Sequence, residues 1–182
     1  MPRWLLIGLL IAATALAGVS LFDMRRVTVP DACVTADEAL RAQDYNRAID
    51  HYLLCLDAGD YSDPVLAQVY YALGVAYSGK GNHYQAIEDY SRSLEFAPDN
   101  AWAYNNRCWS YGLLRRAEEA LADCEEAVRL LPDEAAILDS RALAHWLLDD
   151  HDKARQDLER ARELDPSFPA WDARFREFEG FY

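Results

Sequence analysis

The side chains that could carry chemistry in this chain are its four cysteines and four histidines. A thiol can act as a nucleophile, bind a metal ion or form a disulfide bond, and an imidazole can act as an acid, a base or a metal ligand. The histidines form no HExxH motif, and their spacing would not bring three ligands to one metal ion. We therefore expect no metal site and no cofactor. The eight residues are Cys33, Cys55, Cys108, Cys124, His51, His83, His145 and His151.

Motifs typical of enzyme active sites are missing from the rest of the sequence. There is no GxSxG nucleophile motif and no phosphate-binding loop. Asp89, Asp123 and Asp157 recur at intervals of 34 residues, and Arg107 and Arg141 are separated by the same interval. We expect these residues to pair between neighbouring helices, where such pairs fix the register more than they add stability. An enzyme is therefore the least favoured class, and we predict no catalytic residue.

The balance of charge limits the partners of the chain. Its 182 residues are 52% apolar and 27% charged, which is typical of a compact folded domain. Thirty-one acidic residues against eighteen basic ones give a formal net charge of -13. This charge would repel a phosphate backbone, because nucleic-acid binding depends on contacts from Lys and Arg. We therefore expect no nucleic-acid partner.

The first 22 residues differ in composition from the rest of the chain. After Arg3, residues 4–22 contain no charged side chain, and the small-residue motif "ALA" ends at Ala17. This arrangement is typical of an export signal that is cleaved after Ala17. The uncharged run would also form a helix roughly 29 Å long, just enough to cross a bilayer. A retained membrane anchor is therefore the alternative, and it is slightly favoured; residues 23–28 then form a linker.

A repeat of 34 residues organises most of the remaining sequence. Three prolines spaced by 34 define three units when each is placed at position 32: residues 67–100, 101–134 and 135–168. Large side chains dominate positions 4, 7, 11 and 24 of these units, and small ones dominate positions 8, 20 and 27. The residues at positions 4, 7, 8, 11, 20, 24, 27 and 32 are Tyr70, Leu73, Gly74, Tyr77, Ala86, Tyr90, Ser93 and Pro98; Tyr104, Arg107, Cys108, Tyr111, Ala120, Cys124, Ala127 and Pro132; and Leu138, Arg141, Ala142, His145, Ala154, Leu158, Ala161 and Pro166.

This pattern resembles the tetratricopeptide repeat. The resemblance implies an all-α fold in which antiparallel helix pairs stack into a right-handed superhelix, here preceded by an N-terminal signal or anchor helix. One helix pair cannot bury its own apolar face, so neighbouring pairs must share a continuous core. Large residues would fill the space between helices, and small residues would let the backbones approach.

The segments on either side of the three units fit the same architecture. A degenerate first unit, residues 29–66, is expected to have a shortened first helix at residues 32–40. Asp63 is expected to cap the helix that follows, with Pro64 in its first turn, where a missing N–H costs nothing. Residues 169–182 are expected to form a capping helix over the last unit, and the apolar residues of that helix are Trp171, Phe175 and Phe178.

The repeat frame also predicts how the cysteines pair. Cys108 and Cys124 hold positions 8 and 24 of their unit, and Cys33 and Cys55 hold positions 5 and 27 of the degenerate one. Both pairs are symmetric about position 16, the centre of the turn, so their members face each other across an antiparallel helix pair. We expect two disulfides in an exported protein, Cys33–Cys55 and Cys108–Cys124. The alternative is four reduced, buried cysteines.

A partner-binding surface is implied by the resemblance. In tetratricopeptide proteins, positions 2, 5, 9, 12 and 13 of each first helix line a concave groove that commonly binds peptides. Trp and Tyr in such a groove often carry binding energy, although some of these rings could instead pack between units. The cationic clamp that some members use for terminal carboxylates is missing, and only Asn106 matches it. The expected contact residues are Tyr71, Trp102, Asn105, Trp109, Asp139, Leu143 and Trp146.

Together these features predict a protein–protein interaction scaffold of the cell envelope. We expect an exported protein, either periplasmic or anchored in the inner membrane facing the periplasm through residues 4–22, that binds a protein or peptide in the concave groove. The alternative is a structural subunit of a membrane-associated complex that uses its convex face or its N-terminal helix. An enzyme is a distant third.

Overall fold

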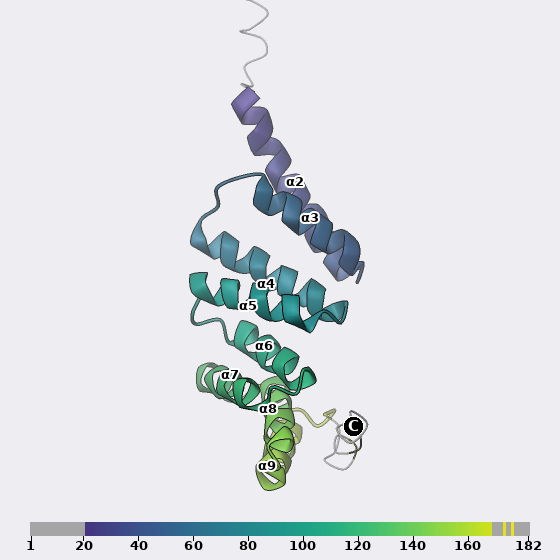
Figure 1. Ribbon diagram of the computed structural model, residues 1–182, viewed down its shortest axis with the longest axis vertical. Helices are drawn as coiled ribbons and strands as arrows, with labels where there is room; N and C mark the ends of the chain where they lie inside the picture. Colours follow the sequence, from purple (N-terminus) through teal and green to yellow (C-terminus); the bar gives the residue numbers. More distant parts are fainter. Residues whose placement is uncertain (1–20, 169–172, 174–175, 177–182) are drawn as a thin grey trace, which may run out of the picture.

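The computed structural model describes residues 21–168, 173 and 176, and within this part of the chain the fold is all-α, as predicted. Eight helices form four antiparallel hairpins that stack in chain order, with α2 at one end and α9 at the other (Figure 1). The hairpins are α2/α3, α4/α5, α6/α7 and α8/α9. The helices are α2 Leu21–Arg41, α3 Tyr45–Asp57, α4 Asp63–Gly79, α5 His83–Phe96, α6 Ala101–Leu113, α7 Ala117–Leu130, α8 Ala135–Leu147 and α9 His151–Leu164.

Both ends of the chain carry predictions that the structure does not address. The predicted signal or anchor lies outside the described residues except for its last two positions, which begin α2. The predicted capping helix also lies outside them, apart from Ala173 and Arg176. Among the helices that are described, none combines the length and the hydropathy needed to span a bilayer.

The first hairpin differs from the expected degenerate unit in the length of its first helix. α2 starts at Leu21 and continues through residues 23–28, which we had assigned to a linker. The hairpin is crosslinked by Cys33–Cys55, whose Cα atoms are 5.2 Å apart. The second predicted disulfide, Cys108–Cys124, joins α6 to α7 with a Cα separation of 5.5 Å. Both pairs are those predicted from the symmetry about the turn.

Small side chains allow the two helices of each hairpin to approach. Ala86, Ala120 and Ala154, all at position 20 of their units, are fully buried. Gly74 shows why position 8 must be small, because a Cβ atom there would lie 2.5 Å from the Tyr90 ring. The volume that a larger side chain would occupy is therefore filled by the ring of the partner helix.

Two of the predicted ion pairs are present inside hairpins. Arg107 donates two hydrogen bonds to Asp123, of 2.6 and 2.7 Å. Arg141 binds Asp157 in the same way, at 2.8 and 2.6 Å. Asp89 holds the equivalent position in α5 and is equally buried, but none of the described cationic side chains pairs with it. The predicted pairing is thus confirmed for two of the three acids.

The helix ends follow local chemistry. Asn82, Asn100 and Asp150 each accept a hydrogen bond from the backbone N–H three residues further on, which begins α5, α6 and α9. α4 differs from our prediction, since its N-cap is Ser62 and Asp63 is already its first helical residue. Pro64 lies in the first turn, as expected.

Candidate functional site

The predicted contact residues are not equally accessible. Only Trp102 is exposed, with 39% of its surface accessible to solvent. Tyr71 and Trp109 are half-buried. The other four are buried and offer little surface to a partner. Fewer of the predicted contact residues are therefore accessible than the sequence suggested. These four are Asn105, Asp139, Leu143 and Trp146.

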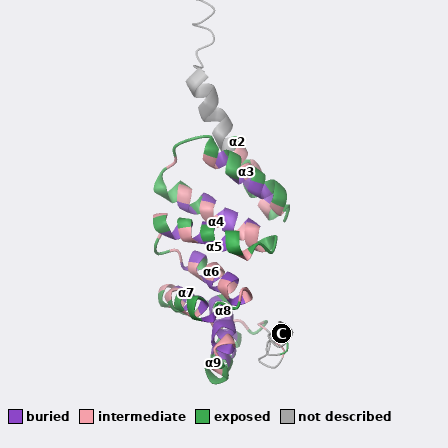
Figure 2. Ribbon diagram, viewed as in Figure 1, coloured by how far each residue is buried: buried purple, intermediate pink, exposed green. Residues whose placement is uncertain are grey.

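Close packing between α6 and α8 explains why the C-terminal half of the groove is closed. A Cβ atom on Gly112 would lie 2.9 Å from a methyl group of Leu143, so glycine allows the two helices to come together there. Leu143 and Trp146 join the core cluster of the last hairpin, and Trp109 packs against that cluster. Figure 2 shows α8 coloured largely as buried. These α8 side chains are therefore part of the core, and their contact with a partner stays a prediction.

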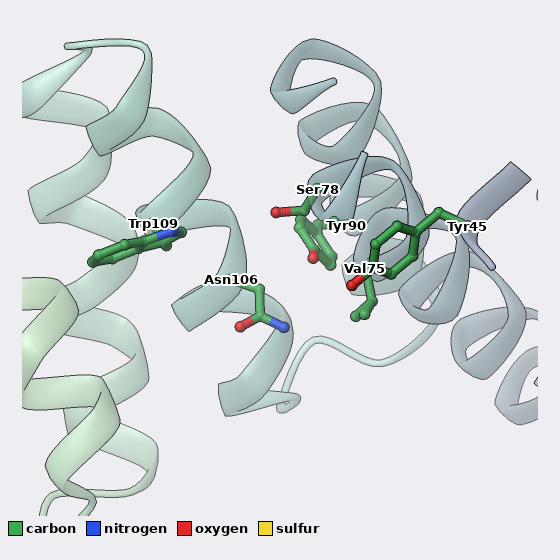
Figure 3. A pocket seen from close by; sticks show the side chains of 7 residues that line it. Tyr45, Val75, Ser78, Tyr90, Asn106 and Trp109 are labelled. Atoms are coloured by element: carbon green, nitrogen blue, oxygen red, sulfur yellow. The ribbon is translucent and has the colours of Figure 1, made fainter. Parts of the chain in front are cut away.

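An open hollow lies instead between α4 and α6. It has a volume of about 230 Å³. Asn106 and Trp109 form its α6 wall, and residues of α3, α4 and α5 face them (Figure 3). We call this space the tyrosine pocket. Its lining residues are Tyr45, Val75, Ser78, Gly79, Tyr90, Asn106 and Trp109.

A second hollow continues from the tyrosine pocket towards α2. It has a volume of about 360 Å³ and shares Val75 with the first. Two charged residues, Asp37 and Arg41, lie in its wall. We call the two hollows together the N-terminal groove. The residues lining the second hollow are Asp37, Leu40, Arg41, Tyr52, Gln68, Tyr71, Ala72 and Val75.

Two separate groups of side-chain hydrogen bonds lie along this groove. The Asn106 carboxamide donates from Nδ2 to the Tyr71 hydroxyl at 3.1 Å. Asn105 donates from Nδ2 to the Asn106 Oδ1 atom at 3.3 Å, which fixes the orientation of the Asn106 amide. The Oδ1 atom of Asn105 is buried without a hydrogen-bond partner. At the other end, the Tyr52 hydroxyl donates to Asp37 at 2.5 Å.

Burial raises the pKa values of three tyrosines of the groove, Tyr52, Tyr71 and Tyr90, which favours their neutral forms. Burial raises the pKa of Tyr71, and hydrogen bonding from Asn106 offsets only part of that effect. Burial likewise raises the pKa of Tyr90, despite the opposing influence of Ser78 and Asn106. For Tyr52, burial and the neighbouring Asp37 both raise the pKa. These three phenols can therefore act both as hydrogen-bond donors and as acceptors.

The histidines and acids of the described part of the chain are not arranged as a metal site. No three His, Cys, Asp or Glu side chains are grouped there in a way that could hold a metal ion. Burial lowers the pKa values of His83 and His145, which favours neutral rings. His145 lies 4.0 Å from Asp157 within the core of the last hairpin. His145 is therefore a buried core residue of this hairpin.

Sequence reasoning missed the residues that neighbouring hairpins contribute to the tyrosine pocket. Tyr45 belongs to α3, yet its ring covers Gly79 at the end of α4, where a Cβ atom would lie 2.4 Å from it. Tyr90 reaches the pocket from the second helix of its hairpin. A position-by-position reading of first helices cannot find these residues. The only signal in the sequence was a glycine in the last turn of a helix, beside a turn that already contains Gly81.

Comparisons with known proteins place this geometry in a family. Residues 67–100 and 135–168 each match a model described as the tetratricopeptide repeat. No curated protein sequence matches the chain.

Solved structures with the same fold include the first such domain of human RPAP3, which is 27% identical with a TM-score of 0.59, covering 65% of this chain and 93% of that one. The first domain of Spaghetti (RPAP3), solved with the HSP90 peptide SRMEEVD, is also 27% identical; its TM-score is 0.60, and 67% of this chain and 97% of that one are covered. MamA from Desulfovibrio magneticus RS-1 is 18% identical, with a TM-score of 0.67 over 76% of each chain. The chain thus contains tetratricopeptide repeats, at residues 67–100 and 135–168, and shares the fold of these solved proteins.

Proposed function

We propose that this protein is an interaction scaffold that binds an extended segment of a partner protein in its N-terminal groove. The observation that carries the proposal is the groove itself, open along α4 and lined by hydroxyl, carboxamide and aromatic groups. Such groups bind peptides by hydrogen bonds and by burial of rigid rings. The solved relative that holds a peptide supports this use of the fold. The family and its peptide-binding relatives point to a non-enzymatic role.

The compartment is part of the same proposal. Structural disulfides persist in oxidising compartments, and the described chain has two, with no free cysteine among its described residues. Together with the uncharged run at residues 4–22, they support an exported protein that is periplasmic or tethered to the membrane facing the periplasm.

Photocrosslinking tests the groove directly. A photoreactive phenylalanine analogue replaces Val75, which borders both hollows, in the full-length chain expressed in its host. A matched control carries the analogue at Tyr84, which is 68% exposed on α5 and lines neither hollow. We expect a crosslinked partner from position 75 and none from position 84. Adducts from position 84 alone would contradict the proposal.

A second candidate, a structural subunit that docks through its convex side, is supported by two exposed side chains. Leu53 and Leu54 lie on the second helix of the first hairpin and are 48% and 57% exposed. Exposed apolar residues on second helices are what such a subunit would use. The same crosslinking experiment with the analogue at Leu54 separates the two. A partner captured only there would favour the structural role.

A further inference from the structure

We propose that the tyrosine pocket is a specificity pocket for one bulky, uncharged side chain of the bound segment, aromatic or branched aliphatic. The inference depends on the proposed peptide-binding function and names the chemistry of the partner. It follows from the charge, the size and the walls of this pocket.

Charge is the first constraint. The lining of the tyrosine pocket contains hydroxyls, one carboxamide, one indole, one valine and one glycine, and no ionised side chain. A carboxylate or an ammonium group entering it would lose water without gaining a counter-charge, which is costly. The nearest charges in the groove, Asp37 and Arg41, line the other hollow. An uncharged side chain is therefore preferred.

Size is the second constraint. The pocket measures about 230 Å³. A protein cavity of about 150 Å³ lined by apolar residues is large enough to hold benzene. The pocket therefore has room for one ring or one branched chain. The pocket is open to the groove, so a segment could insert one side chain while its backbone continues past Tyr71.

The walls favour a ring or a branched chain over a small group. Trp109 forms one side of the pocket, and Tyr45 and Val75 lie opposite (Figure 3). Flat aromatic surfaces gain most from contact with other rings or with large aliphatic groups. Beside the pocket, the Tyr71 hydroxyl accepts a hydrogen bond from Asn106, and a phenol can in addition donate its own O–H. A backbone carbonyl of the segment is a suitable acceptor for it.

A peptide selection tests the inference. Phage-displayed random heptapeptides are selected on the full-length chain in detergent, and the affinities of enriched peptides are measured by fluorescence polarisation. We expect enriched peptides to share one aromatic, Leu or Ile residue. The acidic peptide SRMEEVD, which the solved relative binds, serves as the charged probe and should bind at least tenfold more weakly.

Variants of the pocket locate the binding. Val75→Phe and, as a second filling variant, Ser78→Leu should each weaken the enriched peptides at least tenfold, while Tyr84→Ala should not. Helical circular dichroism checks that each variant is folded. Peptides that are sensitive to the filling variants but share acidic residues would overturn the inference and leave the proposed function standing. Peptides insensitive to both variants, or no enrichment at all, would overturn the proposed function and the inference with it.

Discussion

Hairpins α4/α5 and α6/α7 each have a buried aspartate at the same repeat position, but only the aspartate of α6/α7 pairs with an arginine. Asp89 and Asp123 are each 7% exposed. Arg107 on α6 reaches Asp123 with two hydrogen bonds, whereas α4 has Leu73 at the matching position. Burial raises the pKa of Asp89 to about 6, and Arg92 offsets this only in part. The residue at repeat position 7 of the facing helix, Arg107 or Leu73, therefore determines whether the buried acid pairs across the hairpin or is an uncompensated buried charge at neutral pH.

Removal of the paired acid should produce the largest effect. Asp123→Ala leaves the guanidinium of Arg107 without its counter-charge, with only the hydrogen bond to Ser91 remaining, in a site where the arginine side chain is only 18% exposed. Breaking a buried pair in this way costs about 3–5 kcal/mol, which urea unfolding followed by circular dichroism would detect. Glu119→Ala, which breaks the exposed Arg116–Glu119 pair, is the control and should change little. Equal effects of the two substitutions would show that burial does not set the strength of these pairs.

The first hairpin has neither an arginine at position 7 nor an aspartate at position 23 of its repeat. Thr35 and His51 occupy them, and Cys33–Cys55 crosslinks the helices instead. Replacing both cysteines by serine should lower the free energy of unfolding by about 3 kcal/mol. Hydrogen exchange should then accelerate first in α2 and α3. Uniform acceleration across all hairpins would contradict the view that this disulfide stabilises its hairpin locally.

Asp89, the buried acid without an arginine partner, should make the protein less stable as the pH rises. The folded-state pKa of Asp89, about 6, lies above its ordinary value of 3.8, so the folded chain holds this proton more tightly than the unfolded chain. Its contribution to stability is fully present below about pH 4 and is lost as the pH rises through 6. Asp89→Asn should therefore stabilise the protein by about 3 kcal/mol at pH 7.5 and hardly at all at pH 4.

Thermal unfolding of the Asp89→Asn variant across this pH range is the measurement. Asp123→Asn is the matched control and should destabilise at pH 7.5, since Arg107 loses the charge of its partner. A loss of stability for Asp89→Asn at neutral pH would mean that the carboxylate has a stabilising role in α5.

The smallest expected effects concern the turns. The same turn position holds Gly81, with φ of 82°, in one hairpin and Gln43, with φ of 58°, in another. A Cβ atom on Gly81 would meet no atom within 4 Å, so Gly81→Ala tests backbone strain alone and should cost about 1 kcal/mol. Gln43→Gly relieves that strain, but glycine loses more entropy on folding. The free energy of unfolding should therefore rise by only a few tenths of a kcal/mol. Differential scanning calorimetry would compare the two, and equal shifts of the same sign would contradict this explanation.

The sequence predicted features that depend on one hairpin. The cysteine pairs, the two Arg–Asp pairs and the small residues at position 20 follow from the repeat frame, because both partners lie in the same unit. The candidate site was predicted less well, because it depends on how units pack against each other. Gly112 lets α6 approach Leu143 and closes one half of the groove, while Tyr45 crosses from another unit to form a wall of the other half. Neither contact can be predicted from a single unit.

The position of Tyr45 has a consequence for the order in which the tyrosine pocket is assembled. This ring starts the second helix of the hairpin that Cys33–Cys55 crosslinks, and it rests on Gly79 of the next hairpin. The pocket is complete only when the first hairpin is docked. A newly made chain whose cysteines are still reduced should hold that hairpin less firmly, so oxidation of this one cysteine pair should also steady a wall of the tyrosine pocket that contains no sulfur.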